Sequence, residues 1–129
     1  MRPILADSSW YITEARNRHD PLLHLAELSR VRDIAICGII TAEVGRGIKD
    51  SNTLQRYTDS WEVMRYIASD QKVWQHTLEL TWQLDRQGKV LPIQDIQIAA
   101  CALSINAVVL TYDEHFHEIP GIDATDRIL

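Results

Sequence analysis

Four acidic residues that lie far apart in the chain have the placement expected of a metal-binding site. Each one follows an apolar run or opens a helical segment: Asp7, Glu43, Asp95 and Asp113. Carboxylates that converge repel one another and raise one another's pKa. A divalent cation that prefers oxygen ligands, such as Mg²⁺ or Mn²⁺, removes this repulsion. The four acids therefore predict metal-dependent chemistry, provided that the fold brings them together.

The apolar pattern predicts elements that would bring them together. Continuous apolar runs indicate strands at 4–6, 33–37 and 107–110, with a short last strand near 122–124. Helical spacing indicates helices at 10–17, from 21 onward, and at 40–48, 53–68, 72–87 and 95–105. Alternating strands and helices favour a three-layer α/β/α domain around a mainly parallel sheet. Ligands of such sheets bind beyond the carboxyl ends of the strands, which is where the acids fall.

Asp95 is the most informative of the four acids. It shares a helical stripe with Ala99 and Ala102, and that stripe should face the core. A charge directed there costs several kcal/mol unless it is paired or binds a metal ion. Glu43 is expected near the N-terminal end of its helix, where an acid also has a purely structural use, because it complements the helix dipole.

Taken singly, each acid has such a structural interpretation. Asp7, which precedes Ser8 and Ser9, fits an ordinary helix cap, and Asp113 fits the start of a surface turn. Only the set of four favours a site.

Length and composition are those of one globular domain, residues 1–129. No apolar run is long enough to cross a bilayer, and the N-terminus lacks the apolar stretch of a secretory signal, so we expect a cytoplasmic protein. The net charge of −5 gives no basic surface for nucleic acid, although a bound cation would neutralise a carboxylate site. Cys37 and Cys101 lie among apolar residues and are expected to be small buried side chains.

The acids and their local contexts resemble the motifs of PIN domains, in particular those of the VapC-type toxins of bacterial toxin–antitoxin pairs. The resemblance spans the chain and rests on four motifs, at residues 4–9, 40–47, 91–100 and 109–116. The third, Leu-Pro-Ile-Gln-Asp-Ile-Gln-Ile-Ala-Ala, is the most specific of them. The chain departs from the family where His115 holds a place that is acidic in many relatives.

The resemblance implies a PIN-like fold and a Mg²⁺- or Mn²⁺-dependent endoribonuclease that cleaves RNA phosphodiesters with a metal-activated water. It implies that Asp7, Asp95 and Asp113 bind the metal ion directly or through water, and that Glu43 holds metal-bound waters or a second ion. No cysteine or serine nucleophile is needed.

Three further residues are candidates for supporting roles. Ser9 and Thr111 are expected to hydrogen-bond the acids, or else to be an ordinary cap and a strand-end hydroxyl. Arg46 is expected to pair with Glu43 at rest and to contact a substrate phosphate. His115 and His117 alternate beside Asp113, but without a further ligand pair they are interpreted as loop histidines rather than a zinc site.

The resemblance also implies partners: an RNA substrate, a cognate antitoxin and a second copy of the chain in a homodimer. The antitoxin is expected to direct an Arg or Lys at the acids, where it could displace the metal ion. Two other functions compete. A phosphoacceptor domain of the receiver type would need a lysine after a late strand, and the only late lysine is Lys89. An inactive PIN-fold binding module for RNA or protein is the stronger rival, although all four acids are present.

Overall fold

The central element is a five-stranded sheet in which every pairing is parallel, in the order β3-β2-β1-β4-β5. A computed structural model describes residues 1–128. The strands are β1 (Ile4–Ala6), β2 (Ile34–Cys37), β3 (Arg65–Ile67), β4 (Val108–Leu110) and β5 (Ala124–Thr125). The chain crosses from one strand to the next through helices, as parallel pairing requires.

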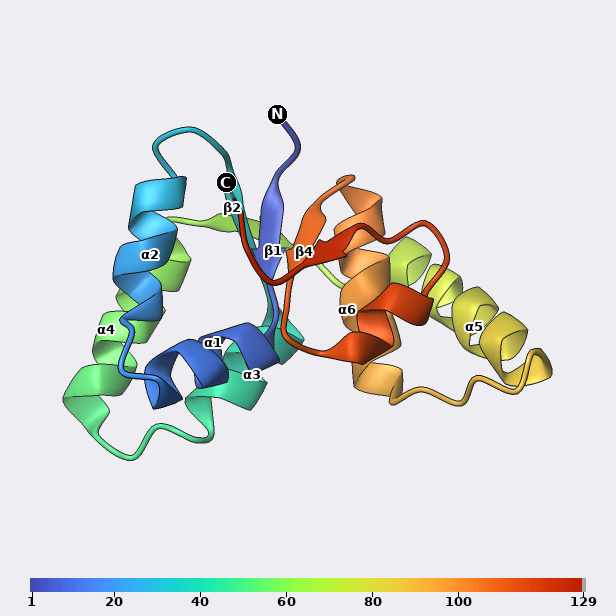
Figure 1. Ribbon diagram of the computed structural model, residues 1–129, viewed down its shortest axis with the longest axis horizontal. Coiled ribbons are helices and arrows are strands. Elements are labelled where there is room, and N and C mark those ends of the chain that lie inside the picture. The colour runs from blue at the N-terminus through green and yellow to red at the C-terminus, as the bar shows by residue number, and fades with distance from the viewer. Residues whose placement is uncertain (129) are drawn as a thin grey trace.

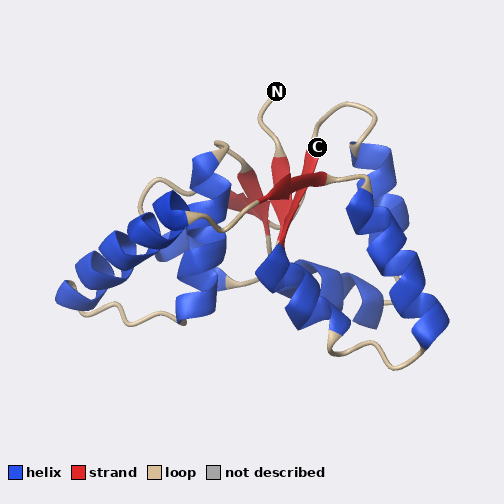
Figure 2. Ribbon diagram, turned by 180° about the vertical axis from the view of Figure 1, so that it is seen from behind, coloured by secondary structure: helices blue, strands red, loops and turns tan. Residues whose placement is uncertain are grey.

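Six α-helices and one short 3₁₀ segment surround the sheet within the described residues. They are α1 (Ser8–Arg16), α2 (Pro21–Leu28), α3 (Gly38–Gly45), α4 (Ser51–Glu62), α5 (Gln71–Arg86), α6 (Ile93–Ser104) and the 3₁₀ segment η1 (Glu114–Glu118). Figure 1 shows α2 and α4 on one side of the sheet and α5 and α6 on the other. The view from behind gives the same three layers (Figure 2). The predicted three-layer α/β/α fold is confirmed.

Burial follows from this layering. Every residue of β1 and β2 is buried, because helices cover both faces of the central strands. The stripe of α6 that Asp95 opens is also in the core, with Ala99 and Ala102 fully buried as predicted. Both cysteines are buried and free, in agreement with the sequence. Among residues 1–128, no helix is both long enough and apolar enough to cross a membrane.

One strand lies where the sequence predicted helix. The helix expected at 53–68 begins at Ser51 and ends at Glu62, and residues 65–67 form β3 beside β2. Without β3, the backbone of the buried strand β2 would have an unpaired edge, which is costly away from water. Tertiary pairing therefore overrides the helical spacing of this segment. A smaller difference is that α3 begins at Gly38 rather than Ile40 and ends at Gly45 rather than Ile48.

Candidate active site

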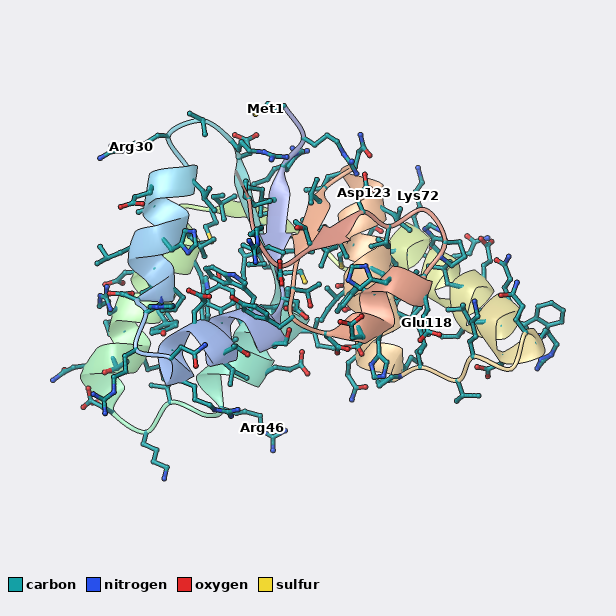
Figure 3. All side chains as sticks on the ribbon, viewed as in Figure 1. Met1, Arg30, Arg46, Lys72, Glu118 and Asp123 are labelled. Atoms are coloured by element: carbon teal, nitrogen blue, oxygen red, sulfur yellow. The ribbon has the colours of Figure 1, made fainter. Side chains whose placement is uncertain are left out.

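The predicted acids lie at or near the edge of the sheet formed by the carboxyl ends of the strands. Figure 1 shows the starts of α1, α3 and α6 gathered there with η1, below the strands in that view. Arg46 lies at this lower edge in Figure 3, whereas Met1 and Asp123 lie at the upper one. The parallel sheet thus collects residues that are more than a hundred positions apart in the chain.

Asp7 is the most deeply buried of the four acids, with 3% of its surface exposed. It caps α1, accepting a hydrogen bond from the backbone amide of Trp10 at 3.0 Å. Burial raises the pKa of its carboxyl group to about 6, against the opposing effect of hydrogen bonds from Thr111, Trp10 and Ser9. The nearby negative charge of Asp113 raises this pKa further. A positive charge beside Asp7 would therefore stabilise its ionised form.

Two hydroxyl groups connect Asp7 to the turn that carries Asp113. Ser9 Oγ donates to Asp7 Oδ1 at 2.8 Å, and Thr111 Oγ1 donates to Asp7 Oδ2 at 2.8 Å. Thr111 Oγ1 also accepts from the backbone amide of Asp113 at 2.9 Å. Ser9 Oγ accepts from the amide of Tyr112 at 3.1 Å. The hydrogen bonds that the sequence predicted for Ser9 and Thr111 are present, and they fix the end of β4 against the start of α1.

Asp95, Asp113 and His115 form the closest cluster of potential metal ligands in the described residues. One donor atom from each lies within 4.8 Å of the other two. His115 Nδ1 is 2.9 Å from Asp95 Oδ2 and 3.2 Å from Asp113 Oδ1. Burial and the neighbouring Asp113 raise the pKa of Asp95, although its hydrogen bond with His115 acts in the opposite direction. The hydrogen bond with Asp95 in turn raises the pKa of His115.

From the sequence, His115 was interpreted as a loop histidine, and its position beside Asp95 and Asp113 was not predicted. The η1 segment turns its ring back over Asp113, while His117, two residues later, is exposed. The available signal was the departure from the family motif, since His115 occupies a place where many relatives have an acid.

Glu43 joins the site only indirectly. It is the sixth of eight residues in α3, so the prediction that it lies near the N-terminal end of its helix is wrong. The reason is that α3 starts immediately after β2 and ends at Gly45. Ser8 Oγ donates to Glu43 Oε1 at 2.7 Å, which ties α3 to the residue that follows Asp7. Among residues 1–128, no hydrogen bond joins Glu43 to another of the four acids.

The i+3 spacing of Glu43 and Arg46 suggested an ion pair between them. Among the ion pairs of residues 1–128, this pair is absent. Arg46 caps the C-terminal end of α3, is exposed, and extends away from the molecule at the lower edge of Figure 3. This leaves the guanidinium group accessible to an anion from solvent.

The donor set fits a divalent cation. Asp95 and Asp113 offer carboxylate oxygens, His115 offers an imidazole nitrogen, and Asp7 adds a buried carboxylate on the adjoining turn. Oxygen donors suit Mg²⁺ and Mn²⁺, and one nitrogen is compatible with most transition-metal ions. A cation held there would offset the repulsion among the acids.

Comparison with known proteins gives the chain a family context. Residues 4–122 match a family model described as PIN domain. No match was found among curated proteins. Several solved structures, including the following three, are similar over nearly the whole chain. The first is a DNA-bound VapBC from Salmonella typhimurium, with 25% identity, a TM-score of 0.75, and 97% of this chain and 98% of that chain covered.

The second is VapBC2 from Rickettsia felis bound to a promoter DNA fragment, with 23% identity, a TM-score of 0.78, and coverage of 95% and 97%. The third is VapBC-1 from nontypeable Haemophilus influenzae, with 21% identity, a TM-score of 0.76, and coverage of 95% and 96%. The fold is therefore shared over nearly the whole length of each chain.

Proposed function

The chain belongs to the PIN domain family, and from this premise we propose that it is a Mg²⁺- or Mn²⁺-dependent endoribonuclease, the VapC-type toxin of a type II toxin–antitoxin pair. The observation that carries the proposal is the meeting of Asp95, Asp113 and His115 within 4.8 Å. The hydrogen-bonded connection from Asp113 through Thr111 to Asp7 supports it. Collecting these charges at one sheet edge is unfavourable unless a cation offsets their repulsion.

In this proposal the residues have distinct roles. Asp7, Asp95 and Asp113 hold the ion, which when bound would activate a water molecule and stabilise negative charge on the phosphoryl oxygens. Ser9 and Thr111 keep the Asp7 carboxylate in one orientation through their hydrogen bonds.

Two residues face the substrate side. Glu43, held by Ser8, accepts hydrogen bonds from water at the same edge. Arg46, exposed at that edge, attracts a phosphate of the RNA. Positioning and electrostatics of this kind are what phosphodiester cleavage mainly requires.

The decisive experiment is an RNA cleavage assay on purified protein freed of any partner. We expect cleavage with Mg²⁺ or Mn²⁺, no cleavage with EDTA, and loss of about 100-fold or more in rate for Asp7→Ala, Asp95→Ala and Asp113→Ala. Asp85→Ala, which removes an exposed acid near the end of α5, is the matched control and should retain full activity. Wild-type protein that cuts no RNA with either ion would overturn the proposal in favour of an inactive binding module.

An antitoxin is the proposed protein partner, because the similar solved structures include VapBC toxin–antitoxin complexes. An Arg or Lys of the antitoxin would meet the acidic cluster and compete with the cation there. Expression of this chain alone in the bacterial cytoplasm should arrest growth, whereas co-expression with its cognate antitoxin should restore growth. A wild-type chain that is harmless and purifies without a partner would count against this part of the proposal.

A homodimer is the remaining proposed assembly. Its support in this chain is an exposed apolar stripe on α5, formed by Trp74, Leu78 and Trp82, whose side chains are half or more exposed. Exposed large apolar side chains that share one face are uncommon on a monomer surface.

A further inference from the structure

We propose that His115 Nδ1 is a direct ligand of the divalent ion, and that this nitrogen makes the site prefer a first-row transition-metal ion over Mg²⁺. The inference rests on the proposed metal-dependent function and deepens it, because it names which ion the site selects and which residue selects it.

Distances between the donor atoms support direct ligation. Ligand atoms bound to one ion at about 2.1 Å, at right angles to one another, lie roughly 3 Å apart. His115 Nδ1 lies 2.9 Å from Asp95 Oδ2 and 3.2 Å from Asp113 Oδ1. His115 Nδ1 therefore already has the spacing of a neighbouring ligand to each of the two carboxylate oxygens, and all three atoms lie within 4.8 Å of one another. A small outward movement of the imidazole would make room for the ion among them.

The local backbone directs Nδ1, rather than the far nitrogen of the ring, toward the acids. The backbone amide of His115 donates to Asp113 Oδ1 at 2.9 Å, so the main chain at His115 is fixed to the carboxylate that its ring faces. The next residue, Phe116, is fully buried and anchors η1 to the core. The ring itself is only partly covered, with 42% of the side chain exposed, so an ion can reach it from solvent.

Ligand chemistry then decides between metals. Mg²⁺ is a hard cation that keeps water and carboxylate oxygens and gains little from imidazole. Transition-metal ions bind nitrogen more readily, in an order that rises from Mn²⁺ through Fe²⁺ and Co²⁺. A site with three carboxylates and one imidazole therefore discriminates against Mg²⁺, whereas an acid in place of His115 would remove the discrimination.

The first test looks for the nitrogen directly. Pulsed electron paramagnetic resonance on protein loaded with Mn²⁺ detects a ¹⁴N nucleus bound to the ion. We expect ¹⁴N modulation in the wild type and in His117→Ala, the control that removes the exposed histidine of the same segment. We expect its loss in His115→Ala. Absence of ¹⁴N modulation in the wild type, or its persistence in His115→Ala, would overturn the inference.

The second test measures selectivity by calorimetric titration with Mg²⁺, Mn²⁺ and Co²⁺ separately, on folded protein checked by circular dichroism. His115→Asp should lower the ratio of Mn²⁺ to Mg²⁺ affinity by about tenfold, and the ratio of Co²⁺ to Mg²⁺ affinity by more. Equal changes for all three ions, or no binding at all, would contradict the inference. Because neither test reads RNA cleavage, an oxygen-only site in an active nuclease would refute this inference and leave the proposed function intact.

Discussion

The carboxylate of Asp7 is almost completely buried from water. Burial raises its pKa from the ordinary value of 3.8 to about 6, so ionisation is less favourable in the folded protein than in the unfolded chain. The cost appears above that pKa, where the group has lost its proton in both states but is poorly solvated only in the folded one. A residue retained for binding a cation is expected to weaken the fold in this way when the cation is absent.

Asp7→Asn should therefore stabilise the metal-free protein while abolishing RNA cleavage. Asparagine removes the buried charge and can still accept the capping hydrogen bond from the amide of Trp10. We expect the free energy of unfolding at pH 7 to rise by on the order of 1–3 kcal/mol in EDTA. Chemical denaturation measures it, with the exposed Asp59→Asn as the control that should show no gain.

The pH dependence checks the cause of this gain. An acid whose pKa is raised on folding holds its proton more tightly in the folded state, so the wild type recovers stability as pH falls through about 6 toward 3.8. The advantage of Asp7→Asn should accordingly shrink between pH 7 and pH 5. A gain that is constant over this range would mean that the charge of Asp7 is not its source.

At the scale of elements, residues at the ends of the helices hold neighbouring helices together. Asp20 caps α2, accepting from the amide of Leu22 at 3.0 Å, and its other oxygen pairs with Arg56 of α4. Partial burial acts to raise the pKa of Asp20, but the bonds from Arg56 and the two backbone amides outweigh it, so the pKa lies below 3.8. Asp20 thus connects two helices on the same side of the sheet.

We expect Asp20→Ala to lower the free energy of unfolding at pH 7 by about 1–2 kcal/mol, because a cap and an ion pair are lost together. A group with a lowered folded pKa stabilises the protein above its unfolded pKa, and that stabilisation is lost as pH falls through the folded value. The difference from wild type should therefore diminish at pH 3. Glu27→Ala, at an exposed position of the same helix, is the control and should change stability by no more than about 0.5 kcal/mol.

Some of these elements could be predicted from the sequence alone, and others could not. Strands β1, β2 and β4 were predictable because continuous apolar runs indicate burial on both faces. From them followed the nearness of Asp7 and Asp113, since parallel strands end at one edge, whereas Asp95 reaches that edge from the first turn of α6. β3 was not predictable, because Met64 and Ile67 continue a helical spacing and only pairing with β2 makes that segment a strand. His115 was missed for a similar reason: the fold of η1, and not spacing along the chain, turns its ring toward the acids.

At the scale of the whole molecule, α5 lies at the far end from α2 and α4 (Figure 1). The exposed side chains of Trp74, Leu78 and Trp82 form its apolar stripe. The stripe is complementary to itself. A two-fold axis through Leu78 places Trp74 of one copy opposite Trp82 of the other, and Arg86 opposite Asp70, which carry opposite charges. Arg86 already packs over the ring of Trp82, with its guanidinium carbon 4.7 Å from the ring centroid.

Leu78→Asp should convert a dimer into a monomer without unfolding it, because it places two like charges at the centre of the proposed interface while Leu78 is 65% exposed in the single chain. Light scattering coupled to size exclusion measures the mass, and circular dichroism checks the fold. Asn52→Asp, which adds the same charge to the exposed first turn of α4, should remain dimeric. If the wild type is already monomeric over a range of concentrations, α5 is not a self-association surface. If Leu78→Asp stays dimeric, the two copies meet elsewhere.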